Sequence, residues 1–163
     1  MTWRTAFFAQ AQSDYGVFRE FKSRSDIAMC HKLHYLQMAM EKLAKAFQSS
    51  RNGDPPPKIH TAIVRFLKIS KGRPEIRRLL GYENNHHAFS SYIDSLLEVA
   101  EQIEQLAPIG HQERPSPEYP WSDNNGGAIS PISYSFPEFS RQALVEFQKL
   151  ADGLFRIFPH VNA

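Results

Sequence analysis

The sequence of 163 residues has little cysteine, little excess charge of either sign and no long apolar run. Because Cys30 is its one cysteine, the chain cannot close an internal disulfide, and we expect a reducing, cytoplasmic setting. The net charge of +2 does not by itself indicate a nucleic-acid-binding protein, which needs clustered basic residues. No run approaches the roughly 20 apolar residues of a membrane span, so we expect neither a membrane helix nor a signal peptide.

Sequence motifs of several enzyme classes are also missing. There is no glycine-rich phosphate loop and no nucleophile elbow. Cys30 and His31 are neighbours, but adjacent side chains on a helix point about 100° apart and do not form a Cys–His pair. His31 and His34 have a spacing that one metal ion can bridge, yet Glu41 lies about two helical turns further on. We therefore expect no metal site and no cofactor.

What the chain does contain is helical periodicity along most of its length. Apolar residues recur at i, i+3 and i+4, which is typical of helices that turn one face to a core. Pro131 disfavours a central strand in the segment around it, and no series of strands is apparent. The predicted fold is all-α, an antiparallel up-and-down bundle of four to five helices in a single domain over residues 1–163. Helices are expected at about 5–22, 25–48, 58–70, 84–107 and 137–158, with a short helical segment from 74 to 81.

Two local signals refine this picture. Ser25 is a favourable N-cap residue for the second helix, and Asp26 is placed to interact with the positive end of that helix. Between residues 108 and 137 the chain is a long proline-rich loop, and loops of this length are often functional. We expect Tyr119 and Trp121 to pin this loop onto the bundle, since amphipathic rings often close over the edge of a core.

The segment from Cys30 to Phe47 raises the main functional question, because its polar residues are not scattered. Its apolar residues fall on two nearly opposite sides of the helix, which is typical of a central helix. Buried polar groups need partners, so we expect a hydrogen-bonded strip in which Glu41 pairs with a Lys or Arg of another helix. The alternative is that the strip opens into a binding cleft. The strip between the two apolar sides holds His34, Gln37, Glu41 and Lys45, with His31, Met38 and Lys42 beside it.

Three stretches of the sequence together resemble the HEPN domain family: SDYGVF (13–18), CHKLHYLQMAMEKLAKAF (30–47) and KIHTAIVRFLK (58–68). Members of that family are small helical bundles whose second helix carries a His or Tyr, a Gln and an EKxxKA signature. The family pattern also has a basic residue and a histidine at the start of the next helix, which here are Lys58 and His60. The resemblance covers residues 1–70 and places the helix-two signature at His34, Gln37, Glu41, Lys42, Lys45 and Ala46.

This resemblance implies one of two function classes. The family includes metal-independent ribonucleases, and also inactive members that bind nucleotides or pair with nucleotidyltransferases, often in toxin–antitoxin or defence systems. The nucleases have an Arg and a His separated by four to six residues near the start of a later helix. Arg24 and His31 have this spacing, but they lie at the start of the second predicted helix. We therefore predict a non-catalytic module and no enzyme activity, with Arg24 and His31 as the candidate catalytic residues of the alternative.

We expect the module to form a homodimer and to bind a nucleotide, RNA or a protein partner at the solvent end of the polar strip. One alternative is a ribonuclease in which His31 or His34 is the general base and Arg24 stabilises the phosphate. The other is a structural bundle that buries its aromatic residues against a second copy. The predicted ligand-binding residues are His31, His34, Gln37, Glu41 and His60. The candidates for an RNA-binding surface, or else a solvated face, are Lys68, Lys71, Arg73, Arg77 and Arg78.

Overall fold

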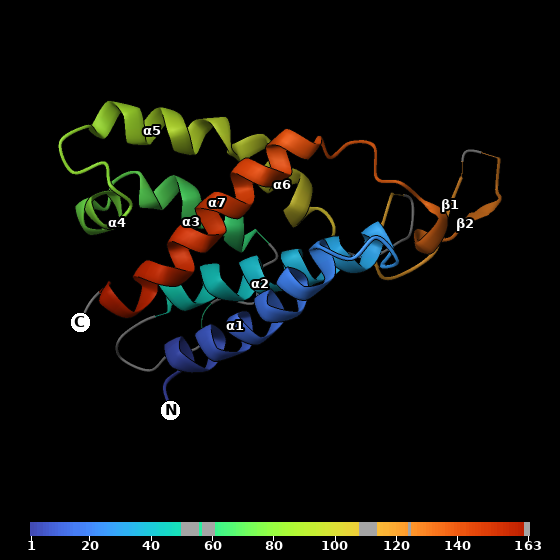
Figure 1. Cartoon of the computed structure of the whole chain (residues 1–163), viewed down its shortest axis with the longest axis horizontal. Helices are drawn as coiled ribbons and strands as arrows, with labels where there is room; N and C mark the ends of the chain where they lie inside the picture. Colours follow the sequence, from blue (N-terminus) through green and yellow to red (C-terminus); the bar gives the residue numbers. More distant parts are fainter. Residues whose placement is uncertain (50–55, 57–60, 108–113, 124, 162–163) are drawn as a thin grey trace.

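The structure is a computed structural model that describes residues 1–49, 56, 61–107, 114–123 and 125–161. Within these residues the fold is all-α, as predicted (Figure 1). A two-stranded antiparallel sheet pairs β1 (Trp121–Ser122) with β2 (Ala128–Ile129). The helices are α1 (Trp3–Lys22), α2 (Met29–Gln48), α3 (Ala62–Ser70), α4 (Pro74–Leu79), α5 (His86–Ser95), α6 (Leu97–Glu104) and α7 (Arg141–Ile157), with short 3-10 turns η1 (Pro131–Ser133) and η2 (Phe158–His160).

The helix α2 lies in the middle of the fold. α1 runs antiparallel along it, and α3 and α6 contact it from the other side (Figure 1). Its buried residues extend from Cys30 at one end to Phe47 at the other, and they lie on more than one face of the helix. The two apolar sides of this sequence therefore correctly predicted a central helix.

The connection between α1 and α2 differs from the prediction. The N-cap residue of α2 is Ala28, so the prediction that Ser25 starts this helix was wrong. The Asp26 carboxylate accepts two hydrogen bonds from the Arg24 guanidinium, at 2.6 Å from Nη2 and 3.1 Å from Nε. Lys32 reaches back from α2, and its Nζ donates to the Arg24 carbonyl oxygen at 2.7 Å. These contacts stabilise a turn in the place of a first helical turn.

The fourth predicted helix is divided into α5 and α6. α5 begins as predicted after Asn85, whose side-chain oxygen accepts a hydrogen bond from the Ala88 backbone N–H at 2.8 Å. At the break, the Ser95 hydroxyl donates to the Tyr92 carbonyl oxygen at 2.7 Å. A side-chain hydroxyl that bonds to a nearby carbonyl competes with the helical pattern, and here the buried Leu96 follows it and starts the next helix.

The proline-rich segment before α7 contains the one strand pair among the described residues. β1 and β2 place Trp121 opposite Ile129, a pairing that the sequence analysis did not predict. The Trp121 side chain is buried and lies edge-on to Tyr134, with 5.0 Å between the ring centroids. Trp121 therefore pins this segment to the core, as predicted. Tyr119 was expected to share this role but is 48% exposed, so that part of the prediction was wrong.

The last helix, α7, begins later than predicted and packs against α6, with a further contact to α1. Its N-cap residue is Ser140, whose hydroxyl accepts a hydrogen bond from the Ala143 backbone N–H at 3.1 Å. The Tyr15 hydroxyl donates to the Asp152 carboxylate at 2.9 Å and so links α1 to α7. Residues of the N-terminal half of α7 line one groove together with the end of α1 and the start of α2.

Candidate functional site

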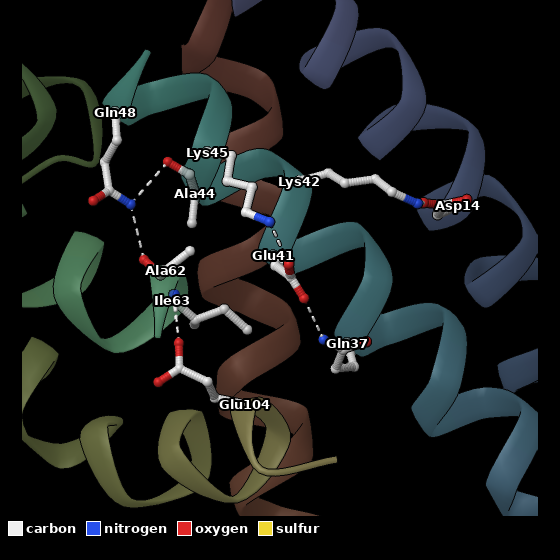
Figure 2. Close-up of polar contacts among 10 residues, drawn as sticks. All are labelled: Asp14, Gln37, Glu41, Lys42, Ala44, Lys45, Gln48, Ala62, Ile63 and Glu104. Atoms are coloured by element: carbon white, nitrogen blue, oxygen red, sulfur yellow. Dashed lines mark hydrogen bonds and ion pairs between the residues drawn. The ribbon is translucent and has the colours of Figure 1, made fainter. Parts of the chain in front are cut away.

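The C-terminal half of α2 carries the polar strip predicted from the sequence, and its members hydrogen-bond to one another. The buried Gln37 amide donates from Nε2 to Glu41 Oε2 at 2.7 Å. Lys45 forms an ion pair with Glu41 Oε1 at 2.5 Å. Figure 2 shows both contacts lined up along the helix. Both oxygens of Glu41 thus accept hydrogen bonds, from Gln37 and from Lys45 of the same helix.

An ion pair between helices lies next to this strip. Lys42 extends from α2 to Asp14 of α1, with 2.5 Å between Nζ and Oδ2 (Figure 2). Asp14 is one of the buried charged residues of the fold, and it also accepts a hydrogen bond from Gln10 at 3.2 Å. This ion pair joins α2 to α1, and the predicted pairing of Glu41 with a Lys or Arg of another helix stays a prediction.

A buried glutamate that the sequence analysis missed completes the polar centre of the fold. Glu104 of α6 is only 8% exposed, and its Oε1 accepts the backbone N–H of Ile63 at 2.7 Å and of Val64 at 3.4 Å (Figure 2). Thr61, the N-cap residue of α3, makes no side-chain capping hydrogen bond. Glu104 therefore caps α3 from a different helix.

The surroundings of Glu104 disfavour its negative charge. Burial raises the pKa of this carboxyl above that of an ordinary glutamate, and the charges of Glu41 and Glu101 raise it further, while the two backbone N–H groups lower it. The sequence held a signal for this residue, because it recurs in register with Ala100 and Ala107 on the buried side of its helix. A charged side chain at such a position indicates a capping or hydrogen-bonding role.

The predicted ligand-binding histidines do not join the polar strip. His31 is exposed, and His34 is half-buried with its ring edge-on to Tyr35, 5.3 Å between centroids. Neither imidazole hydrogen-bonds to a described residue. His60 lies outside the described residues. In the described part of the chain, no three His, Cys, Asp or Glu side chains are grouped so that they could hold a metal ion.

The candidate catalytic pair is also not assembled. Arg24 is exposed and its guanidinium is bound to Asp26 through two nitrogens, which lowers the pKa of the Asp26 carboxyl. No hydrogen bond joins Arg24 to His31. A ribonuclease of the predicted type needs its cation and its general base at the same phosphate. The arrangement of Arg24 gives no support to that chemistry.

The predicted RNA surface is divided by local contacts. Lys71 forms an ion pair with Asp94 at 2.8 Å. Arg73 donates to the Phe47 carbonyl oxygen at 3.5 Å, and the Nε atom of Arg77 is buried without a hydrogen-bond partner. Three of the five basic residues are therefore engaged with the protein or partly withdrawn from solvent, which leaves Lys68 and Arg78 as exposed cations.

An apolar groove lies at the N-terminal half of α2, and none of the predicted ligand-binding residues that the structure describes lines it. It has a volume of about 490 Å³ and is formed by the C-terminal end of α1, the N-terminal half of α2 and the N-terminal half of α7. Ligand sites of proteins are commonly concave and mostly apolar, and fall in this size range. The apolar side chains that line it are Phe18, Met29, Leu33, Leu36, Leu144 and Val145, with Phe139 at the start of α7.

Three cations stand at this groove. Lys22 donates to the amide oxygen of Gln148 at 3.4 Å across the groove, and Lys32 donates to a backbone carbonyl. Arg141 makes no hydrogen bond to a described residue. None of the three forms an ion pair with the described chain, in contrast to Lys42 and Lys45 of the polar strip. The groove thus combines an apolar lining with three cations that form no ion pair within the described chain, although the pKa of the nearby Asp26 carboxyl is lowered by its hydrogen bonds from Arg24 and, in smaller part, by the charge of Lys32.

The groove escaped prediction because it is built from three segments that are distant in sequence. No motif joins the ends of α1 and α2 to the start of α7, and each segment alone reads as an ordinary amphipathic helix. A signal for it was the set of cations at Lys22, Lys32 and Arg141, each next to apolar positions of its own helix. These cations indicate a common site only once the fold has brought the three helices together.

Comparison with other proteins adds no relative to these observations. Among the described residues, no helix combines the length and the apolar character that a membrane crossing requires. No protein-family model, curated protein or solved structure matches this chain.

Proposed function

We propose that this chain is a HEPN-like, non-catalytic binding module whose ligand lies in the groove between α1, α2 and α7. The observation that carries the proposal is a contrast between two sets of charged side chains, those with partners inside the fold and those at the groove without an ion-pair partner in the described chain. The polar strip and Arg24, which were the candidates for chemistry, are engaged in ion pairs and hydrogen bonds within the fold. The groove has an apolar lining and three cations without a carboxylate partner, so it suits a ligand that is both apolar and anionic.

The proposal moves the predicted binding site along α2. The sequence analysis placed it near His31, His34, Gln37, Glu41 and His60. The groove instead uses Met29, Leu33 and Leu36 of the same helix, on the side that α7 covers. A nucleotide, an RNA and a protein partner all contain anionic groups and remain the three ligand classes of this proposal.

The resemblance to HEPN domains supplies the biological setting of the proposal. It implies a cytoplasmic module that works as a homodimer or beside a nucleotidyltransferase partner, in a toxin–antitoxin or defence system. Size-exclusion chromatography with light scattering tests the homodimer directly. A mass of one chain at all concentrations would contradict that part.

The first test separates the binding module from a ribonuclease. The chain is incubated with several RNA types in the presence of EDTA, beside the Arg24→Ala and His31→Ala variants. We expect no cleavage above a buffer control, because the Arg24 guanidinium is bound to Asp26 and is not placed beside His31 at a common phosphate site. Cleavage by the wild type that is lost in both variants would contradict the non-catalytic proposal.

The second test asks whether the groove binds anions. Thermal unfolding is measured with each common nucleotide, with short RNAs and with acidic peptides. A ligand present at 100 times its dissociation constant stabilises the fold by about 2.7 kcal/mol, which is a readily measured rise in melting temperature. We expect the rise to disappear in the triple variant Lys22→Gln, Lys32→Gln and Arg141→Gln. A rise that survives in this variant would place the site elsewhere.

A further inference from the structure

We infer that the groove between α1, α2 and α7 is a docking site for an acidic amphipathic helix of a partner protein. This inference rests on the proposed binding function and chooses one of its three ligand classes. Helices commonly bind proteins in this way, with the apolar face seated in a groove and the anchor residues at i, i+3 or i+4, and i+7. The length, the lining and the charge of this groove each favour such an occupant.

The length of the groove matches the anchor spacing of a short helix. Along α2 the lining extends from Met29 to Leu36, which is two turns, or about 10 Å. Along α7 it extends from Arg141 to Gln148, which is again two turns. Anchors at i and i+7 of a docked helix span the same distance of about 10 Å. The groove therefore accommodates one set of anchors on a helix that lies along it.

The apolar lining can adapt to such anchors. Val145 is 38% exposed at the groove, and Met29 is half-buried, so both side chains offer contact area to a ligand. Methionine has a flexible, polarisable side chain that fits irregular apolar partners. The floor is formed by Leu33 and Leu36, each 1% exposed, so the groove is closed beneath and does not continue into the core. The apolar face of a helix can rest on such a closed groove without entering the core.

The positive charge of the groove favours a partner helix that carries acidic residues on both sides of its apolar stripe. Lys22 of α1, Lys32 of α2 and Arg141 of α7 bring one cation from each of the three helices to the groove. Within the described chain none of the three has an ion-pair partner, so all three cations remain available to acidic residues of a ligand. Glu or Asp residues on both sides of an apolar stripe would meet cations from both walls of the groove.

The aromatic side chains of the groove favour a protein over a nucleic acid. Proteins that bind single-stranded nucleic acids stack the bases on exposed aromatic faces. The two aromatic residues of this groove, Phe18 and Phe139, are 3% and 7% exposed. Their rings are thus covered by the fold, and the apolar contact surface of the groove comes from Met29 and Val145, neither of which can stack on a base.

The experiment uses designed peptides and the full chain. The probe is a stapled helix of about five turns with Leu at i, i+3, i+4 and i+7 and Glu on both flanks, because short unstapled helices are marginal in water. One control peptide has Gln in place of every Glu, and another has Lys. Binding is measured by fluorescence anisotropy at about 50 mM and about 200 mM salt, since screening separates charge from apolar contact.

Three variants of the chain locate the binding. Arg141→Glu reverses one groove cation, and Val145→Glu places a carboxylate in the apolar lining. Arg156→Glu is the matched control, because Arg156 is also an exposed arginine of α7 but does not line the groove. We expect the Glu peptide to bind the wild type and Arg156→Glu equally, and to bind Arg141→Glu and Val145→Glu at least about tenfold more weakly, or about 1.4 kcal/mol. We also expect Arg141→Glu to favour the Lys peptide relative to the wild type.

Several results would overturn the inference. Equal weakening in Arg156→Glu and Arg141→Glu would mean nonspecific attraction between charges. A second result is that the Glu peptide does not bind, while nucleotides or RNA bind and lose their affinity in Arg141→Glu. This result would support the proposed binding module and exclude a helix as its ligand. A concentration-dependent dimer that Val145→Glu abolishes would make a second copy the occupant. RNA cleavage without any binding at the groove would overturn the proposed function itself.

Discussion

The two halves of α2 differ in whether their basic side chains form ion pairs. In the C-terminal half, Lys42 and Lys45 are each paired with a carboxylate, and the side chains of these pairs are between 10% and 19% exposed. In the N-terminal half, Lys32 bonds only to a backbone carbonyl beside an apolar groove. The same residue type is thus part of the protein's internal structure at one end of the helix and is available to a ligand at the other.

Solvent explains why the fold tolerates both states. A charge that is withdrawn from water needs a partner, because its desolvation costs several kcal/mol. A cation at the mouth of an open groove keeps its hydration and loses little by having no partner. Pairing is therefore required in the polar strip but not at the groove. A polar cluster found in a sequence is more informative about function when its members remain unpaired in the fold.

The largest predicted effect comes from breaking the ion pair beside the polar strip. Lys42→Met removes the cation from Asp14, which stays buried with Gln10 as its remaining partner. We expect a loss of about 3 kcal/mol in the free energy of unfolding, at the lower end for a buried pair because Lys42 keeps some contact with water. Urea denaturation followed by circular dichroism measures this loss.

Two controls separate the ion pair from the change of side chain. The double variant Asp14→Asn and Lys42→Met removes both charges, and we expect it to recover most of the lost free energy. Lys149→Met removes a cation from the exposed pair with Glu146, and it should cost less than about 1 kcal/mol. Equal losses in Lys42→Met and Lys149→Met would mean that the buried ion pair contributes no more to stability than the exposed one.

The next effect concerns Glu104, which caps α3 from another helix. Glu104→Ala leaves the Ile63 backbone N–H without its acceptor, and a buried donor without a partner costs about 1–3 kcal/mol. Glu104→Gln keeps an oxygen at the same position and removes the charge, so it should cost much less. Thermal unfolding of both variants at neutral pH checks the order. A larger loss in Glu104→Gln than in Glu104→Ala would show that the cap requires the charge.

The same residue predicts a dependence of stability on pH. Because the folded-state pKa of Glu104 is raised, its contribution to stability is fully present below the pKa of the unfolded chain and is lost as the pH rises through the folded-state value. As the pH rises through that value, the wild type should lose stability relative to Glu104→Gln, so the cost of the substitution should shrink. The difference in unfolding free energy between the two proteins is measured from about pH 4 to about pH 8. A constant difference would contradict the raised pKa.

The sequence predicted contacts within a helix better than contacts between segments, for one physical reason. Helices depend on periodicity and on local stop signals, so α1, α2 and the start of α5 at Asn85 were found. The strip from Gln37 to Lys45 was also found, since its contacts lie within one helix. One contact between segments was missed, because no local pattern revealed that Glu104 of α6 caps α3. The start of α2 was also misplaced, since the local Arg24–Asp26 pair forms a turn at the position of the predicted cap, Ser25.

The smallest predicted effect on stability comes from the groove. Arg141→Gln removes a cation that has no ion-pair partner in the described chain, so the free energy of unfolding should change by less than about 0.5 kcal/mol. Removing one of three like charges can even stabilise slightly. The measurement is the same urea titration used for Lys42→Met, at low salt, where exposed charges have their largest effect. A loss as large as that of Lys42→Met would show that Arg141 supports the fold, and the groove cations would then belong with the polar strip as structural charges.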